Sequence, residues 1–528
     1  MKSVRSISSN PAVASTAVAA VLAAVYLAWA PPSQDLAAAT FRADLFSEHG
    51  FAFWNDVWYS GHYLFAYSVL YPALGALLGV RVTAALAVVA AAALFAALAE
   101  RRFPDRALLP SLWFAVGVSS WLLTGRVPFL VGVPLGLGAL LALDRGWLAV
   151  AGLLAAASSL ASPVAGLFVA LAGVALALAG QVRKGIWLAL PAAGVIGVLS
   201  LAFPTAGEEP FVFSAFIAIP LLAVAVVVLV PPEHRAVRIG ALLYTLLALG
   251  IVVIADPLGG NVTRLGALFA GPVLALLVWP RGALAVAAVS LPLLYWQLIA
   301  PVRDVGRGTG DLATEREFYE PLLTALDRAH ELGNDPQPPY AVRVHIPPTQ
   351  NRWEAAYVAP RYPIARGWLR QLESGDFDLF TDGNLTAGPY RAWLREHGVS
   401  YVAVPDADLD YLAEDEVELV ASGLPYLDEV WKGDDWALYR VVATSGLTSG
   451  PISLERLDAT SFQVSAFRPA EGVVRIHWTP YWEPSGASAC VSRSGNWTRI
   501  ELREAGEVTV EAVPDLDGLL RQERECSG

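Results

Sequence analysis

Long apolar stretches separated by short polar links fill the first 301 residues of the chain. Most of them are long enough to cross, or nearly cross, a hydrocarbon core of about 30 Å. The expected fold is a polytopic helical membrane bundle with about eleven transmembrane helices. These lie at residues 12–30, 82–99, 107–123, 127–143, 147–160, 163–180, 185–203, 211–230, 238–255, 265–280 and 283–301.

Basic residues near the ends of these stretches predict their orientation, because positive charge accumulates in cytoplasmic loops. The pattern fits if Tyr63–Val80 lies in the membrane plane or re-enters it instead of crossing. With a cytoplasmic N-terminus and eleven spans, the first polar loop, Pro31–His62, and the C-terminal region both lie outside. We therefore expect a multi-pass protein of the cell membrane.

The pattern changes after residue 301 and predicts two extracytoplasmic domains. Residues 302–445 mix helix and strand signals, which indicates an α+β domain, and residues 446–528 carry short alternating segments typical of a β-sandwich. The expected elements are a helix at Glu315–Leu332, a strand at Tyr340–Ile346, a helix at Tyr390–His397, and strands at Val399–Val404, Trp436–Val442, Val473–Trp478, Thr498–Leu502 and Glu507–Val513.

Charge divides at the same boundary. Residues 1–301 hold 15 Lys and Arg against 11 Asp and Glu, a net charge of +4, whereas residues 302–528 hold 21 against 37, a net charge of −16. An acidic outer region repels phosphate, so nucleic acid is disfavoured as a partner. The two cysteines, Cys490 and Cys526, can form a disulfide if this end faces an oxidising compartment.

Familiar nucleotide and metal motifs are absent from the sequence, including GxxxxGK[ST], GxGxxG after a strand, HExxH and CxxC. Asp-x-Asp patterns offer hard oxygen ligands for a divalent cation, but such patterns arise by chance in an acidic domain. No metal site or other cofactor is therefore assigned, and a divalent cation stays an alternative. The patterns are Asp376/Asp378, Asp406/Asp408/Asp410 and Asp515/Asp517.

The first polar loop is the most informative stretch, because it holds four of the eleven acidic residues found before residue 302: Asp35, Asp44, Glu48 and Asp56. Carboxylates at the mouth of a membrane bundle are costly unless they have a function. One of them can serve as a general base toward an acceptor hydroxyl. Cytosolic nucleotide sugars do not reach that side, so the expected donor is a lipid-linked sugar with its phosphate at the interface.

Two arginines at outer helix ends, Arg126 and Arg264, are candidates to bind that phosphate by bidentate hydrogen bonds. Two glycines before Asn261 would let the backbone approach a ligand closely. Each candidate also has a structural alternative. Asp35 suits a helix N-cap, Asp44 and Glu48 suit a solvated helix face, Asp56 suits a turn, His62 suits an interfacial contact, and Arg126 and Arg264 suit headgroup contacts.

At these motifs the chain resembles the GT-C-type membrane glycosyltransferases, particularly the uncharacterised actinobacterial integral membrane proteins of that superfamily. The resemblance rests on the motifs Asp35-Leu, Phe41-Arg-Ala-Asp-Leu-Phe46, Trp54-Asn, Trp58-Tyr, Gly61-His, Tyr67-Ser-Val-Leu70, Arg352-Trp-Glu-Ala-Ala-Tyr357, Arg366-Gly-Trp, Arg370-Gln and Trp478-Thr-Pro-Tyr-Trp482.

The resemblance implies an inverting transfer from a polyprenyl-phosphate sugar to a cell-envelope polysaccharide, lipid or protein. It assigns the catalytic carboxylate to the first outer loop, at Asp35 by position, although the adjacent acid of many relatives is missing here. Asp44 and Asp56 therefore stay alternatives for the base, with Glu48 and His62 nearby. The outer residues Trp353, Glu354 and Arg366 are expected to shape an acceptor groove.

Two other classes compete with the transferase. A transporter or flippase of a lipid-linked precursor would need ionisable residues at mid-membrane and repeated helix halves, whereas the charges here cluster at helix ends. A non-catalytic envelope-assembly protein would tolerate substitution of the loop carboxylates.

Overall fold

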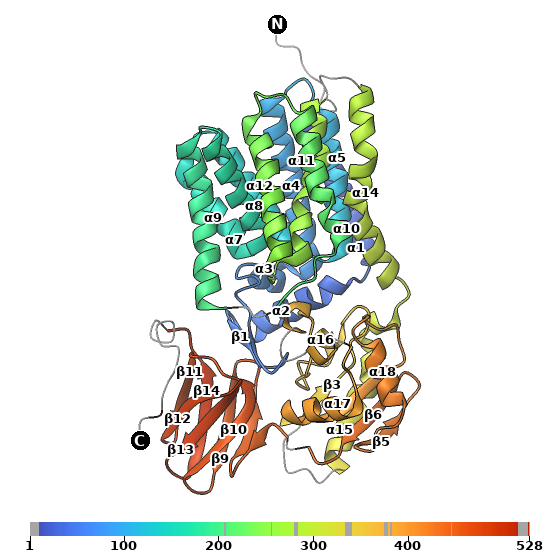
Figure 1. The fold of residues 1–528 in the computed structure, drawn as a ribbon, viewed down its shortest axis with the longest axis vertical. Coiled ribbons are helices and arrows are strands. Elements are labelled where there is room, and N and C mark those ends of the chain that lie inside the picture. The colour runs from blue at the N-terminus through green and yellow to red at the C-terminus, as the bar shows by residue number, and fades with distance from the viewer. Residues whose placement is uncertain are drawn as a thin grey trace. The chain divides into compact units, whose positions relative to one another are not determined.

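A computed structural model describes residues 10–204, 207–254, 256–278, 283–332, 341–373, 378–380, 383–444, 446–515 and 526. By internal contacts the chain forms two units, shown together in Figure 1. Unit 1 comprises Met1–Ser47 and Ala66–Thr309, and unit 2 comprises Glu48–Phe65 and Gly310–Gly528. The expected boundary at residue 301 thus falls eight residues before the observed one, and the first polar loop is divided between the units.

Unit 1 is helical throughout, and each predicted apolar stretch overlaps one helix or two consecutive ones. The α-helices are α1 (Pro11–Trp29), α2 (Gln34–His49), α3 (Tyr71–Leu78), α4 (Val80–Arg102), α5 (Leu108–Ser120), α6 (Val127–Asp144), α7 (Leu148–Ala161), α8 (Pro163–Leu178), α9 (Val182–Ala202), α10 (Phe213–Phe216), α11 (Ala218–Leu229), α12 (Arg235–Val253), α13 (Arg264–Val278) and α14 (Ala283–Gly308). Two 3₁₀ helices, η2 (Trp121–Thr124) and η3 (Gly259–Thr263), precede α6 and α13.

Among the described residues, six helical segments are long and apolar enough to cross a membrane: α1, α4, α6, α9, α12 and the combined Gly259–Val278. Four more apolar segments, Leu108–Thr124, Leu148–Ala161, Pro163–Leu178 and Phe213–Leu229, are shorter. Unit 1 is therefore a multi-pass membrane bundle, whereas the count of eleven spans and the orientation stay predictions. The eight residues of α3 rise about 12 Å, too little to cross the membrane.

Small residues let the helices of unit 1 approach closely, as is typical of membrane bundles. A Cβ on Gly185 of α9 would lie 2.5 Å from the backbone oxygen of Gly173 in α8. These two helices therefore touch through their backbones, and neither glycine leaves room for a side chain.

A buried amide, Gln297 of α14, connects four elements of unit 1. Trp113 of α5 donates to its side-chain oxygen at 2.8 Å, and its side-chain nitrogen donates to the carbonyl of Leu268 in α13 at 3.2 Å. Trp121 of η2 donates to its backbone carbonyl at 3.2 Å. Because a polar group in an apolar interior is costly unless it is hydrogen-bonded, these contacts fix α14 against its neighbours.

Unit 2 contains an α+β part and a β-sandwich, and the division at residues 445 and 446 stays a prediction. Its short elements are β1 (Trp54–Asn55), β2 (His62–Tyr63), η5 (Leu312–Thr314), α16 (Glu354–Tyr357), η7 (Arg370–Glu373), η8 (Asp378–Phe380) and β7 (Thr448–Ser449). The longer ones are α15 (Arg316–Leu332), β3 (Arg343–His345), α17 (Ala387–Glu396), β4 (Val399–Pro405), α18 (Glu414–Ala421), β5 (Leu427–Lys432), β6 (Trp436–Val441), β8 (Ser453–Leu457), β9 (Ser461–Ala466), β10 (Ala470–His477), β11 (Trp482–Gly486), β12 (Ala489–Ser494), β13 (Trp497–Leu502) and β14 (Gly506–Ala512).

The α+β part is built on a mixed sheet with strand order β3-β4-β6-β5. Strands β3 and β4 are parallel, and the other pairs are antiparallel. Trp436 of β6 is buried and donates its indole N–H to the carbonyl of Phe318 in α15 at 2.8 Å. The amphipathic α15 is thereby held against the sheet. Strand β5, which the sequence pattern did not predict, forms one edge.

Two antiparallel sheets, β12-β13-β10-β7 and β11-β14-β9-β8, form the β-sandwich. Alternate residues point inward, so that Val464, Trp482, Ile500 and Val508 are buried. This period-2 pattern is the reason the sequence predicted strands here.

The second half of the first polar loop, Glu48–Phe65, belongs to unit 2 and contacts both of its parts. Trp58 is fully buried and donates its indole N–H to the carbonyl of Ala355 at 3.0 Å. On the sandwich side, the backbone N–H of His477 donates to the carbonyl of Ser60 at 2.7 Å. The segment is therefore an internal part of this unit instead of a free loop.

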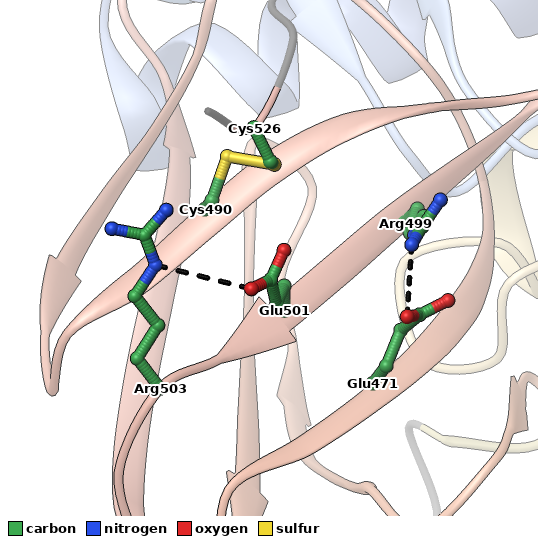
Figure 2. The surroundings of a disulfide bond; sticks show 6 residues. All are labelled: Glu471, Cys490, Arg499, Glu501, Arg503 and Cys526. Carbon is green, nitrogen blue, oxygen red and sulfur yellow. Dashed lines mark ion pairs between the residues drawn. A yellow bond between two sulfur atoms is a disulfide. The ribbon is translucent and has the colours of Figure 1, made fainter. Parts of the chain in front are cut away.

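A disulfide joins Cys490 of β12 to Cys526, as Figure 2 shows. It closes a loop of 36 residues and has a Cα–Cα distance of 5.8 Å. Surface ion pairs lie on the neighbouring strand β13, Arg499 with Glu471 at 2.8 Å and Arg503 with Glu501 at 3.9 Å. Since exposed ion pairs contribute little to stability, the disulfide is the stronger of these interactions, and it ties Cys526 to β12.

We expect the double variant C490S/C526S to lower the free energy of unfolding of unit 2 by about 2–4 kcal/mol, because the cross-link restricts the unfolded chain. Chemical denaturation with and without a reductant measures this effect. The reductant should destabilise the unsubstituted protein and leave the variant unchanged. If the reductant destabilised the variant and the unsubstituted protein equally, the stabilising role of the disulfide would be contradicted.

Candidate functional site

Charged residues from three separate elements of unit 1 meet around Arg126, directly before α6. Its Nε lies 3.5 Å from Oδ2 of Asp35 in α2. Its Nη2 lies 3.8 Å from Oδ2 of Asp304 in α14. All three side chains are largely buried, with 16%, 11% and 9% of their surface exposed. One guanidinium is thus shared by two carboxylates.

A glycine brings Asp35 and Arg126 together. Gly125 has φ +72°, and a Cβ there would lie 2.6 Å from the backbone nitrogen of Leu36 and 2.4 Å from Oγ of Ser33. The turn before α6 therefore packs directly on the start of α2. Because α2 begins at Gln34, Asp35 lies in the first helical turn, where a negative charge is favourable.

Arg264 adds a second buried cation to this site. Its guanidinium donates to the side-chain oxygen of Asn261 and lies 5.4 Å from the ring centre of Phe129. It is within electrostatic range of Arg126 and Asp35. The two predicted phosphate-binding arginines, Asn261 and the predicted base therefore belong to one neighbourhood.

Arg42 and Tyr67 complete the group. Arg42 is 2% exposed, and its guanidinium carbon lies 3.9 Å from the ring centre of Tyr67. Tyr67 is within electrostatic range of Asp35, Arg126 and Arg264. Three guanidinium groups thus accompany two carboxylates, and Glu209 also lies within electrostatic range of Arg264. We refer to Asp35, Arg42, Tyr67, Arg126, Arg264 and Asp304 as the arginine cluster.

The other two acids of α2, Asp44 and Glu48, lie away from the arginine cluster. Asp44 follows Asp35 by nine residues of helix, a rise of about 13.5 Å. Both Asp44 and Glu48 are exposed, and Glu48 pairs with His49 at 3.8 Å. Asp35 is the loop carboxylate for which the structure shows an ion pair with Arg126.

Asp56 and His62 lie in unit 2 and are buried. Asp56 is 1% exposed and accepts the indole N–H of Trp54 at 2.5 Å, while its own backbone N–H donates to the carbonyl of Ala459 at 2.7 Å. Burial raises the pKa of Asp56 well above its ordinary value. His62 stacks on Trp58 at 5.7 Å between ring centres. Contacts with remote segments thus hold the second half of the loop within unit 2, and the roles of Asp56 and His62 stay predictions.

The predicted acceptor-groove residues Trp353, Glu354 and Arg366 are buried in the α+β part, with 4%, 3% and 2% exposure. Arg366 donates to Glu416 at 3.2 Å and also to Glu373. Their side chains therefore contact the interior of unit 2 and do not line an open groove in this structure. Any contact with an acceptor stays a prediction.

Arg366 belongs to a larger buried ionic network. Arg352, at φ +53°, donates to Glu373 at 2.7 Å and to Asp410 at 3.3 Å. His345 and Tyr390 contact Glu416, Tyr390 at 2.7 Å. The buried arginines lower the pKa of Glu373 and Asp410 despite desolvation. The pKa of Glu416 is lowered first by His345 and then by Arg366. Loss of one partner from such a network destabilises the fold, because a buried charge is then left without its counter-charge.

No three His, Cys, Asp or Glu side chains of the described residues gather closely enough to hold a metal ion. Of the Asp-x-Asp patterns, Asp410 pairs with Arg352 and Arg370. Asp376 and Asp517 lie outside the described residues. The assignment of a divalent cation therefore stays an alternative.

Three members of the arginine cluster received no role from the sequence: Arg42, Tyr67 and Asp304. Arg42 and Tyr67 stand in the motifs that carry the resemblance, which was the available signal. Asp304 follows the last apolar stretch directly, a position that indicates a helix end and gives no sign of a partner.

Three similar solved structures cover most of the chain. An oligosaccharyltransferase AglB from Archaeoglobus fulgidus, in complex with an inhibitory peptide and a dolichol-phosphate, has a TM-score of 0.46 and 12% identity, with 75% of this chain and 69% of that one covered. A second Archaeoglobus fulgidus oligosaccharyltransferase structure, tethered to an acceptor peptide, has a TM-score of 0.46 and 10% identity. The match covers 83% of this chain and 75% of that one. The arabinofuranosyltransferase AftD from Mycobacteria, in an R1389S mutant, has a TM-score of 0.41 and 14% identity. The match covers 96% of this chain and 60% of that one.

These similar structures are glycosyltransferases, the kind of protein that the sequence resembled. No protein-family model and no curated protein matches the chain.

We expect Gly125→Ala to separate Asp35 from Arg126, because the new methyl group meets the backbone of α2 and the positive φ itself costs about 1–2 kcal/mol. A double-mutant cycle with D35N and R126Q measures the pair. Coupling of about 0.5–3 kcal/mol in the unsubstituted background should disappear in the G125A background. Gly194→Ala is the matched control, since a Cβ on Gly194 meets nothing within 4 Å. Unchanged coupling would contradict this role of Gly125.

We expect Glu354→Gln to reduce the loss of stability of unit 2 as pH rises. Burial raises the pKa of Glu354 to about 7, above its ordinary 4.5, so the folded state keeps a proton that the unfolded state releases between these values. Glutamine cannot ionise and still accepts the hydrogen bond that Thr349 donates at 2.6 Å. Thermal unfolding at pH 5 and pH 8 should differ less in the variant by a few degrees. Glu317→Gln, at an exposed position, is the control. If the melting temperatures at pH 5 and pH 8 differed equally in E354Q and in the unsubstituted protein, the raised pKa of Glu354 would be contradicted.

Proposed function

We propose that this protein is a membrane glycosyltransferase. It transfers a sugar from a polyprenyl-phosphate-linked donor to a cell-envelope acceptor on the outer face of the membrane, with inversion. The observation that carries the proposal is the arginine cluster of unit 1, where Asp35 lies 3.5 Å from Arg126 and within electrostatic range of Arg264.

The cluster has the two functions that such a transfer needs. Arg126 and Arg264 bind the phosphate by charge-assisted hydrogen bonds, and Asn261 holds the guanidinium of Arg264. Asp35 accepts the proton of the acceptor hydroxyl. The acceptor oxygen then bonds to the anomeric carbon as the bond from that carbon to the phosphate oxygen breaks. Polyprenyl phosphate leaves, and Arg126 and Arg264 stabilise its new charge.

The apolar helices of unit 1 suit a lipid donor, whose chain stays in the bilayer while its phosphate meets the arginines. The disulfide between Cys490 and Cys526 supports an oxidising, extracytoplasmic location for unit 2, because disulfides persist in such compartments. A cytoplasmic N-terminus and an outer C-terminal domain then follow the distribution of basic residues.

We expect Asp35→Asn to lower kcat for sugar transfer by about 10²–10⁴, the usual contribution of a general base. Purified protein in lipid nanodiscs, supplied with radiolabelled decaprenyl-phosphate sugars and envelope oligosaccharide fragments, provides the assay. Exposed Asp105→Asn is the matched control and should keep full activity.

Four results would change the assignment. Full transfer by D35N together with loss in Asp44→Asn would move the base to Asp44, and loss in D56N alone would favour Asp56. Movement of the labelled lipid across proteoliposomes without covalent transfer would support the transporter instead. A cellular role that survives replacement of all three acids would support a non-catalytic protein.

A further inference from the structure

The carboxylate of Asp304 holds two different arginines with its two oxygens. Oδ1 accepts from Arg303 at 3.1 Å, and Oδ2 lies 3.8 Å from Nη2 of Arg126. Asp304 is 7% exposed, whereas half of the Arg303 side chain is exposed. Arg303 thus orients the carboxylate from outside, with the other oxygen directed at the buried guanidinium of Arg126.

Asp304 stands on a fixed part of α14. Seven residues before it, Gln297 bonds to α5, η2 and α13. Four residues after it, a Cβ on Gly308 would lie 2.6 Å from the carbonyl oxygen of Pro32, so this end of α14 packs on the chain just before α2. Because the helix is held on both sides, the distance from Asp304 to Arg126 is set by packing.

The sharing of one cation by two acids has a chemical consequence. If Arg126 paired with Asp35 alone, the full charge of the guanidinium would act on the Asp35 carboxylate. The carboxylate would then be a weaker acceptor for the proton of the acceptor hydroxyl. A second carboxylate at 3.8 Å draws the guanidinium partly toward itself. A donor phosphate at the same guanidinium also meets the negative charge of Asp304, which opposes binding.

We propose that Asp304 is a positioning residue that draws Arg126 away from Asp35, so that Asp35 is free to accept the proton at the expense of donor affinity. This inference rests on the proposed function, since it concerns the base and the phosphate site of that reaction. It assigns to Asp304 a gain in the rate of transfer and a cost in donor binding.

The test is the separation of kcat from KM in Asp304→Asn. Arg126 then pairs with Asp35 alone, so we expect kcat to fall at least about tenfold, while the KM for decaprenyl-phosphate sugar stays equal or decreases. Asp304→Glu, which restores the charge, should recover part of kcat. Arg303→Ala, which releases Oδ1, should change both constants in the same directions by smaller factors. Asp105→Asn is again the control.

Loss of structure would produce a different result, because it raises KM and lowers the melting temperature together. A raised KM for D304N with unchanged kcat, or unchanged constants, would overturn the inference while D35N still defines the base. If the unsubstituted protein transfers no sugar, the proposed function fails first. Binding of decaprenyl phosphate to nanodiscs then tests Asp304 alone: D304N should bind it at least as tightly as the unsubstituted protein, and weaker binding would overturn the inference.

Discussion

The buried guanidinium of Arg126 is the constraint on which the rest of unit 1 depends. A cation in an apolar interior is tolerated only when acids surround it, and Asp35 and Asp304 come from helices far apart in sequence. The start of α2, the turn before α6 and the end of α14 must therefore meet at one point. Gly125 permits this meeting at one side, and Gln297 and Gly308 secure it at the other.

The sequence predicted the helices of unit 1 well, because membrane helices follow from apolar length alone. It also selected Asp35, Arg126 and Arg264, since few charged residues are expected on the outer side of the bundle. It did not select Asp304, whose importance comes from α14 packing beside η2. Ion pairs between distant helices depend on tertiary packing, which a local pattern does not contain.

Four predicted site residues of unit 2 are buried, and their roles stay predictions. Asp56 and His62 stand in the same polar loop as Asp35, and Glu354 and Arg366 stand in polar motifs of an acidic domain, so all four suggested exposed chemistry. In the structure all four are buried. Strand pairs such as Val57 with Ile364 are non-local, and a buried acid with an internal partner has the same sequence pattern as a reactive one.

The division of the first polar loop affects how the protein is made. Glu48–Phe65 leaves the ribosome long before Gly310–Gly528. However, Trp58 and Ser60 form hydrogen bonds with Ala355 and His477, which are synthesised much later. The aromatic side chains of this segment therefore stay exposed until nearly the whole bundle has been inserted and the later residues have been made. A fragment beginning at Gly310 would lack a buried segment of its own fold, and contacts of such long sequence separation form slowly. Unit 2 is therefore the last part of the chain to become native.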